Sequence, residues 1–185
     1  MLFRRRDCIP TDCRKNLYFA LVQLKIQYGI ALYGFSTQKL LKELYASCNR
    51  ILRTLQNRHR YYNVRQLYIN FNTLPVMQLH ELNIGTMIYK CLNGNTLMSS
   101  VIREIFQLNH VYHTHNTRLS ITNHLYIQKN VGFYHSYAFK CCTRWNKIPL
   151  VIRNASSIKI FKSLYSKHLI DNCELNITDS TSVEF

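Results

Sequence analysis

Carboxylates are scarce in this sequence. Its 185 residues contain only 9 Asp and Glu against 24 Lys and Arg, which gives a formal net charge of +15. Phosphoryl transfer on two metal ions needs several carboxylates that converge on one point. The chain has no Asp-Asp pair, no His-Asp pair and no Asp-x-Asp cluster. We therefore expect no catalytic residues of that kind and no enzymatic activity from this chain on its own.

Glycine and proline are also few, at 5 and 3 residues. Phosphate-binding loops, dinucleotide-binding fingerprints and serine nucleophile elbows all need glycines at fixed spacing, and none of these motifs is present.

The apolar run at 17–33 is interrupted by polar residues, and residues 1–6 do not resemble a signal peptide. We therefore expect an intracellular protein, in the cytoplasm or the nucleus, with neither a membrane partner nor a small-molecule substrate.

The seven cysteines are irregularly spaced, and an odd number argues against a disulfide framework. Cys48 and Cys91 lie within apolar helical patterns, where a free thiol acts as a small apolar residue. His110, His113 and His115 offer imidazoles for zinc, but no Cys pair with two-residue spacing accompanies them. We therefore predict buried free cysteines and no metal site, and we leave the role of the histidine cluster open.

Apolar residues make up 47% of the chain, and in most segments they recur at helical spacing. The predicted helices cover residues 13–33, 37–56, 76–92, 98–106, 134–148 and 158–169. A loop is expected at 70–75, and Ser156 or Ser157 is expected to cap the last helix. A brief alternation of apolar residues at 119–127 indicates one or two short strands. The expected fold class is mainly α, a helical bundle with at most a short β-hairpin in the second half.

The composition divides the chain into four regions, within one compact domain or two small helical subdomains that share a core. Residues 1–108 are helical, and residues 109–132 form a polar segment rich in His and Asn, predicted to be a loop or a short hairpin. Residues 133–170 form a second helical region. Residues 171–185 contain four acidic residues and no basic one, so we expect a disordered acidic tail there.

Positive charge is concentrated in the first third of the chain. Residues 1–60 hold 12 Lys and Arg and 3 acidic residues, which favours a polyanionic partner. In the predicted helix at 37–56 the basic residues lie opposite the apolar face, and the pattern continues just past its end. The residues that we expect to contact phosphate are Lys39, Lys42, Arg50, Arg53, Arg58 and Arg60. Tyr61, Tyr62 and Tyr68 follow, and we expect them to lie against sugars or bases.

Short motifs occur along the chain in an order that resembles that of one known family. They are Leu17-Tyr18-Phe19-Ala20-Leu21-Val22, Gln27-Tyr28-Gly29-Ile30, Tyr33-Gly34, Leu55-Gln56-Asn57-Arg58, Leu67-Tyr68, Leu74-Pro75-Val76, Met87-Ile88-Tyr89-Lys90, His115-Asn116-Thr117-Arg118, Trp145-Asn146-Lys147-Ile148-Pro149, Ile152-Arg153 and Phe161-Lys162. This order resembles the thumb and carboxy-terminal region of reverse transcriptases of non-LTR (LINE-type) retrotransposons. Tyr33 stands where that family typically has Trp. The resemblance covers roughly residues 3–170.

The resemblance implies a thumb that grips the template-primer duplex from its minor-groove side and takes no part in bond chemistry. The catalytic motif of the family, an aromatic residue followed by Ala and two Asp, is absent. The chain thus resembles a carboxy-terminal fragment of an RNA-directed DNA polymerase that lacks the palm. Its implied partners are RNA or an RNA/DNA hybrid and the palm domain. The complete enzyme would need Mg²⁺ at that palm, and no cofactor is expected for this chain.

Arg118, in the polar segment, either contacts phosphate or caps nearby carbonyls. Trp145, close to Pro149, is expected to anchor the core at the end of a helix. An alternative function also stays open, a helical interaction module whose apolar face docks on a missing polymerase domain or on another protein.

Overall fold

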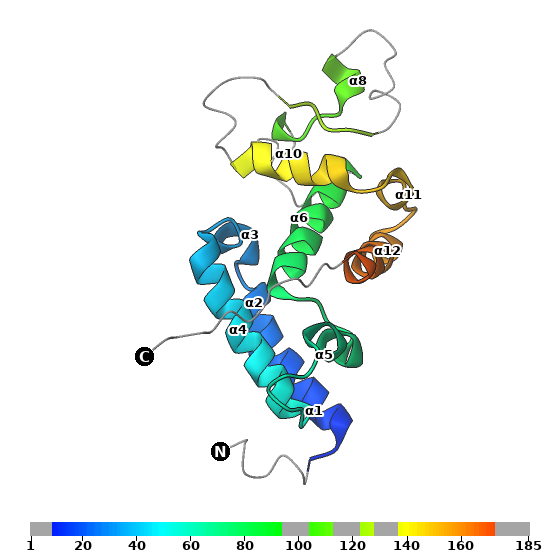
Figure 1. Cartoon of the computed structure of the whole chain (residues 1–185). Helices are drawn as coiled ribbons and strands as arrows, with labels where there is room; N and C mark the ends of the chain where they lie inside the picture. Colours follow the sequence, from blue (N-terminus) through cyan, green and yellow to red (C-terminus); the bar gives the residue numbers. More distant parts are fainter. Residues whose placement is uncertain (1–8, 94–103, 113–122, 128–136, 173–185) are drawn as a thin grey trace.

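The computed structural model describes residues 9–93, 104–112, 123–127 and 137–172, and these residues are mainly helical (Figure 1). The elements are α1 (Thr11–Tyr18), the π-helical turn η3 (Phe19–Gln23), α2 (Leu24–Gln27), α3 (Ile30–Tyr33), α4 (Gln38–Leu55), α5 (Val64–Phe71), α6 (Val76–Leu92), α8 (Asn109–Tyr112), α10 (Tyr137–Lys147), α11 (Leu150–Arg153) and α12 (Ile158–Asp171). Within the described ranges, β-pairing is confined to one antiparallel bridge, between Leu108 and Leu125. The expected mainly α fold class is confirmed.

Helix α6 is the centre of the bundle. It contacts α2, α3 and α4 from the first half of the chain and α10 and α12 from the second half. Figure 1 shows α10 crossing one end of α6 while α4 and α1 lie toward the other end. The ring of Phe161 on α12 stacks on Tyr89 of α6 and on Trp145 of α10, with centroids 4.7 and 5.9 Å apart. Residues of both predicted helical regions therefore contribute to one hydrophobic core.

Gly85 permits the close approach of the second half to α6. A Cβ atom at this position would lie 2.8 Å from Cε1 of Tyr165 and 3.2 Å from Cδ1 of Ile148. Because ordinary van der Waals contact needs about 3.4 Å or more, a larger residue would force the side chain of Tyr165 on α12, or that of Ile148 just after α10, to shift. The missing side chain therefore decides how closely α10 and α12 pack against the central helix.

A smaller apolar cluster joins α1, α4 and α5. Its buried members are Tyr18, Tyr45, Leu52, Leu55, Leu67, Tyr68 and Phe71. Helix α5 was not expected, and the predicted loop at 70–75 begins only at Asn72, whose φ of 50° ends the helix. The prediction that Tyr68 lies against sugars or bases is wrong. Tyr68 is 3% exposed, and its hydroxyl donates a hydrogen bond to Oδ1 of Asn49 at 2.7 Å, because a buried phenol needs a polar partner.

The segment at 13–33 is not the single helix that the apolar pattern predicts. The π-helical turn at Phe19–Gln23 places an extra residue in the helix and rotates everything after it relative to α1. Gly29, with a φ of 72°, then separates α2 from α3. The helix is interrupted because the backbone of Tyr28 is extended and that of Gly29 is left-handed, a conformation that glycine adopts without steric cost.

The face that this segment buries also differs from the predicted apolar face. Tyr18, Ile26 and Ile30 point into the protein, with exposures of 2%, 7% and 0%. Most residues of the predicted apolar face are instead turned to solvent; that face comprises Leu17, Ala20, Leu21, Leu24, Tyr28, Ala31 and Leu32. The most exposed large side chains among them are Leu21, Leu24, Tyr28 and Leu32, at 50%, 61%, 88% and 77%. Apolar residues occur on both sides of this segment, so local spacing did not determine which side the rest of the chain covers.

Most other predicted elements are confirmed. Helices α4, α6 and α10 match the predictions at 37–56, 76–92 and 134–148 to within a few residues, and residues 134–136 lie outside the described part. Ser157 caps α12, because its hydroxyl accepts the backbone N–H of Ile160 at 3.3 Å. Trp145 is 1% exposed, as expected of a core anchor.

The remaining predictions fall partly outside the described residues. Of the helix at 98–106, only 104–106 are described, and of the strands at 119–127, only 123–127, which form the single bridge. Asp171, which was assigned to the predicted tail at 171–185, is instead the last residue of α12. Residues 173–185 lie outside the described part.

Candidate nucleic-acid interface

The predicted phosphate contacts on α4 share one face of the helix. The opposite face is apolar, and Leu41, Tyr45, Cys48 and Leu52 bury it in the core. The cations stand at intervals of 3, 8 and 3 residues, which place them within about 80° of one another around a helix of 3.6 residues per turn. We call these residues the basic stripe; they are Lys39, Lys42, Arg50 and Arg53. The first three are exposed and the last is half-buried.

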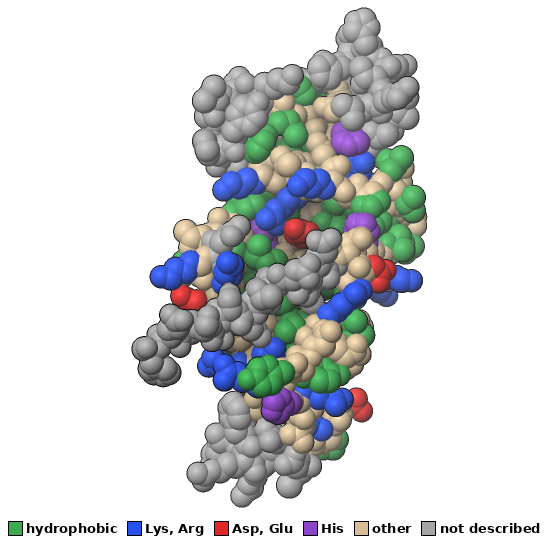
Figure 2. Space-filling model, viewed as in Figure 1, with side chains coloured by type: hydrophobic (Ala, Val, Ile, Leu, Met, Phe, Trp, Pro, Cys, Tyr) green, Lys and Arg blue, Asp and Glu red, His purple; other side chains and the backbone are tan. Residues whose placement is uncertain are grey.

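The basic stripe is long enough to follow a nucleic-acid backbone. Between Lys39 and Arg53, the ends of the basic stripe, α4 rises about 21 Å, at 1.5 Å per residue. One strand of a duplex places a phosphate about every 3.4 Å along the axis, so the stripe is as long as a run of about six phosphates. Figure 2 shows Lys and Arg side chains along the edge of the molecule that α4 forms.

The turn that follows α4 (residues 56–63, the α4–α5 turn) starts from a well-defined helix end. Asn57 adopts a φ of 52°, and its N–H donates to the carbonyl of Thr54 at 3.2 Å. The N–H of Arg58 donates to the carbonyl of Arg53 at 2.8 Å. This pair of hydrogen bonds is a Schellman motif with asparagine in place of the usual glycine. The direction in which the chain leaves the basic stripe is therefore set by backbone hydrogen bonds.

The far end of the α4–α5 turn is held equally well. Asn63 caps α5, since its Oδ1 accepts the N–H of Arg65 at 2.9 Å. The side chain of Gln56 donates to the carbonyl of Leu67 at 2.7 Å and accepts from Asn70 at 3.1 Å. The turn is thus connected to α5 at both ends, which positions its side chains before any ligand binds.

The α4–α5 turn carries the two remaining cations that the sequence pattern singled out in this part of the chain. Arg58 and Arg60 are exposed, and the guanidinium of Arg58 lies over the ring of Tyr62, 4.8 Å from its centroid. Between residues 38 and 63 the only acidic residue is Glu43. The structure therefore brings six of the seven predicted cations onto one helix face and the turn after it. The seventh, Arg118, lies outside the described residues.

A second group of cations was missed by the sequence analysis. Lys140, Arg144 and Lys147 stand on α10 at intervals of 4 and 3 residues, a spacing that was available from the sequence. Arg144 and Lys147 line a cleft of about 480 Å³ between α6, α10 and α12. Its polar lining residues are Gln78, Glu81, Arg144, Lys147, Tyr165, His168 and Asn172.

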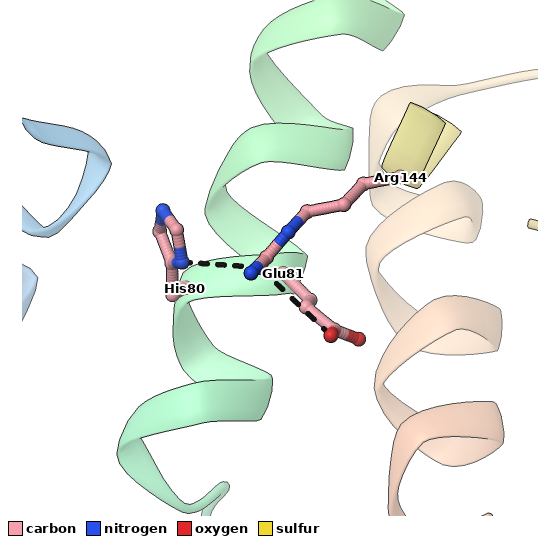
Figure 3. Close-up of polar contacts among 3 residues, drawn as sticks. All are labelled: His80, Glu81 and Arg144. Carbon is pink, nitrogen blue, oxygen red and sulfur yellow. Dashed lines mark hydrogen bonds and ion pairs between the residues drawn. The ribbon is translucent and has the colours of Figure 1, made fainter. Parts of the chain in front are cut away.

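Arg144, which lines this cleft, already has polar partners on α6 (Figure 3). Nη1 of Arg144 lies 3.1 Å from Nδ1 of His80 and 3.8 Å from Oε1 of Glu81. The guanidinium also lies over the ring of Phe35, 4.9 Å from its centroid. Burial and the charge of Arg144 lower the pKa of His80 to about 4, so this imidazole is neutral and its Nδ1 accepts the hydrogen bond. Because Arg144 is already engaged and Glu81 is close by, the basic stripe is the better site for a polyanion.

Metal and thiol chemistry receive little support from the described residues. Within them, no group of three or more His, Cys, Asp or Glu could hold a metal ion. Two members of the histidine cluster, His113 and His115, lie outside the described part. Cys48 and Cys91 are buried thiols, as predicted, and burial raises the pKa of the Cys48 thiol to about 11. None of the described helices has the length and apolar character that a membrane crossing needs.

Comparison with known proteins does not add to this description. No protein-family model, no curated protein and no solved structure matches the chain. Functional inference therefore depends on the chemistry and placement of the residues themselves.

Proposed function

We propose that this chain is the thumb and carboxy-terminal region of a LINE-type reverse transcriptase, which binds template-primer backbone and is not catalytic on its own. The observation that carries the proposal is the basic stripe together with Arg58 and Arg60. Six cations lie on one helix face and its adjoining turn, with Glu43 as the only acidic residue between positions 38 and 63. The order of the short motifs supports the choice of family.

The physical basis of binding is neutralisation of phosphates by Lys and Arg, with release of the cations condensed on the nucleic acid. Such contacts carry no sequence information, because every nucleotide presents the same phosphate. The resemblance to reverse transcriptases makes RNA or an RNA/DNA hybrid the expected ligand, and the phosphate contacts predict binding to any sequence. The same proposal places the protein inside the cell, in the cytoplasm or the nucleus, with the palm of the parent polymerase as a protein partner.

The test uses a double variant, Lys42→Gln/Arg50→Gln, because both side chains are exposed and their loss leaves the core intact. Binding to RNA/DNA hybrids of unrelated sequence is measured by fluorescence anisotropy over a range of salt concentrations. We expect similar losses of affinity for all sequences and a fall of about 2 in the log–log salt slope. The matched control is Lys159→Gln/Lys162→Gln, which removes the same charge from exposed positions on α12. Equal affinity and an unchanged slope for Lys42→Gln/Arg50→Gln would refute the proposal, as would an equal effect of the control.

A docking module is the second candidate function, and the exposed apolar side chains of the first helices favour it. Leu21, Leu24, Tyr28 and Leu32 are all at least 50% exposed, which is unusual for four large apolar residues so close in sequence. Binding of a hydrophobic dye and sedimentation velocity test this function. We expect dye binding to the wild type to fall in Leu24→Ser/Leu32→Ser and to persist in Val151→Ser, a control whose side chain is 77% exposed elsewhere. A monodisperse monomer that binds no dye would exclude it.

A further inference from the structure

Tyr61 is an exposed aromatic residue in the α4–α5 turn, beside the exposed Arg58 and Arg60. Its exposure is 84%, whereas the five tyrosines of the core are at most 5% exposed; these are Tyr18, Tyr45, Tyr68, Tyr89 and Tyr165. Of the described tyrosines, only Tyr28 is more exposed. Tyr61 sits between Arg60 and Tyr62 in the α4–α5 turn, immediately beyond the basic stripe. Its position therefore combines an accessible ring with a surface that attracts phosphate.

The turn holds the ring of Tyr61 beside a second ring. The N–H of Tyr62 donates to the carbonyl of His59 at 3.0 Å, which closes a tight turn around residues 60 and 61. The N–H of Tyr61 lies 3.4 Å from Nδ1 of His59, and the two ring centroids are 5.3 Å apart at an interplanar angle of 38°. Because this short turn is also held by the Schellman motif and by the cap at Asn63, its backbone is constrained around Tyr61.

The three tyrosines named by the sequence analysis thus have different environments. Tyr68 is buried in the core, and Tyr62 is half-buried beneath the guanidinium of Arg58. Tyr61 alone of the three presents most of its ring to solvent. A nucleobase can stack only on a ring whose face it can reach, so Tyr61 is the residue suited to that contact.

We propose that Tyr61 stacks on an unpaired base of a nucleic-acid strand whose phosphates lie along Arg60, Arg58 and the basic stripe. This inference rests on the proposed function and adds a class of ligand to it, a strand with at least one unpaired base. Bases inside a duplex already stack on their neighbours and cannot reach the ring. Every base has a π-face, so the contact distinguishes single strands from duplexes without reading sequence.

The test uses the full chain and a single-stranded oligonucleotide that contains one 2-aminopurine, whose fluorescence is quenched by stacking. The variants are Tyr61→Ala and Tyr61→Phe, and the matched control is Tyr28→Ala, which removes an equally exposed tyrosine from the end of α2. We expect Tyr61→Ala to abolish the quenching by the protein and to weaken single-strand binding by about 5- to 100-fold. Tyr61→Phe retains the aromatic ring and should behave like the wild type, as should Tyr28→Ala.

A fully paired hybrid separates stacking from a structural effect. Tyr61→Ala should bind this duplex as the wild type does, because no unpaired base is present. Equal losses for single strand and duplex would overturn the inference, and so would unchanged quenching and single-strand affinity. The salt slope distinguishes this failure from failure of the proposed function. Tyr61→Ala removes no charge and should keep the wild-type slope, whereas Lys42→Gln/Arg50→Gln should lower it. A wild-type chain that binds neither ligand would refute both.

Discussion

The side chain of Asn146 forms two hydrogen bonds with the backbone of Leu125, one as acceptor and one as donor. Its Oδ1 accepts the N–H of Leu125 at 2.8 Å, and its Nδ2 donates to the carbonyl of the same residue at 3.1 Å. On either side, the carbonyl of His124 and the N–H of Tyr126 pair with residues 109 and 107 at 2.9 Å. The side chain of Asn146 thus takes the place of a neighbouring strand and attaches 123–127 to α10, while Leu125 itself is 1% exposed.

Replacing Asn146 by alanine should therefore destabilise the protein. Asn146→Ala leaves a buried donor and a buried acceptor of Leu125 without partners, and each costs about 1–3 kcal/mol. We expect a loss of about 2–6 kcal/mol in the free energy of unfolding, measured by urea denaturation. Asn146→Asp keeps the acceptor but places a carboxylate oxygen against the carbonyl of Leu125, so it should also destabilise the protein. A change below about 0.5 kcal/mol in Asn146→Ala, the size typical of surface substitutions, would contradict the role of this amide.

Gly34 is needed for space beside His80. A Cβ atom at position 34 would lie 2.4 Å from Cγ and Cδ2 of the imidazole. We expect Gly34→Ala to lower the free energy of unfolding by about 1–3 kcal/mol, because overpacking displaces a buried ring. The clash with the ring disappears in a His80→Ala background, whereas the contact of 2.6 Å with the backbone oxygen of Ile30 remains, so the same substitution should cost less there but still destabilise the protein. Equal costs in the two backgrounds would show that His80 is not the obstacle.

The neutral state of His80 predicts a pH-dependent stability. Burial and Arg144 lower its pKa from 6.5 to about 4, so between these values the unfolded chain binds a proton that the folded chain excludes. Its contribution to stability is complete above pH 6.5 and decreases by up to about 3 kcal/mol as the pH falls toward 4. Urea denaturation at several pH values measures this decrease.

The matched variant for this prediction is His80→Gln, which keeps a hydrogen-bond acceptor for Arg144 and does not titrate. It should lose most of the pH dependence. A remainder of the same sign is expected from His124, whose pKa is also lowered by burial and by Arg153. An unchanged pH profile in His80→Gln would assign the effect to other groups.

Alkylation of the cysteines should distinguish the exposed thiol from the thiols buried in the core. Cys13 is exposed, whereas Cys48, Cys91, Cys141 and Cys142 are buried, and burial raises the pKa of the Cys142 thiol to about 12. The thiolate is the reactive form, so iodoacetamide at pH 8 should alkylate Cys13 and spare the buried four until urea is added. Peptide mass spectrometry gives the extent at each site. Rapid alkylation of Cys142 in the folded protein would contradict its burial.

Several elements were predictable because their determinants are local. Helices α4 and α6 follow from apolar residues at helical spacing, and the start of α12 follows from a serine able to cap it. The basic stripe was visible for the same reason, since cations at fixed intervals on a helix share a face whatever the rest of the chain does. The fold class and the position of the candidate interface on α4 could thus be inferred without a structure.

Other features depended on contacts between distant residues. The sequence around Tyr68 is basic and aromatic, which suggested a surface position. Its hydroxyl instead binds Asn49, which lies 19 positions earlier in the chain. Arg144 has the charge of a phosphate ligand, yet His80 and Glu81, 64 and 63 positions away, already engage it. No local pattern contains such pairings, so sequence reasoning could not assign either side chain correctly.

By itself the sequence determined that this protein is helical, basic and poor in carboxylates, and which face of α4 carries its cations. Only the tertiary structure decided which tyrosine of the α4–α5 turn is accessible and which side of residues 11–33 is covered. The physical reason is that periodicity arises from backbone geometry within one helix, whereas burial depends on which other helices pack against it. Where a segment is apolar on two sides, as here, packing against α4 and α6 makes the choice.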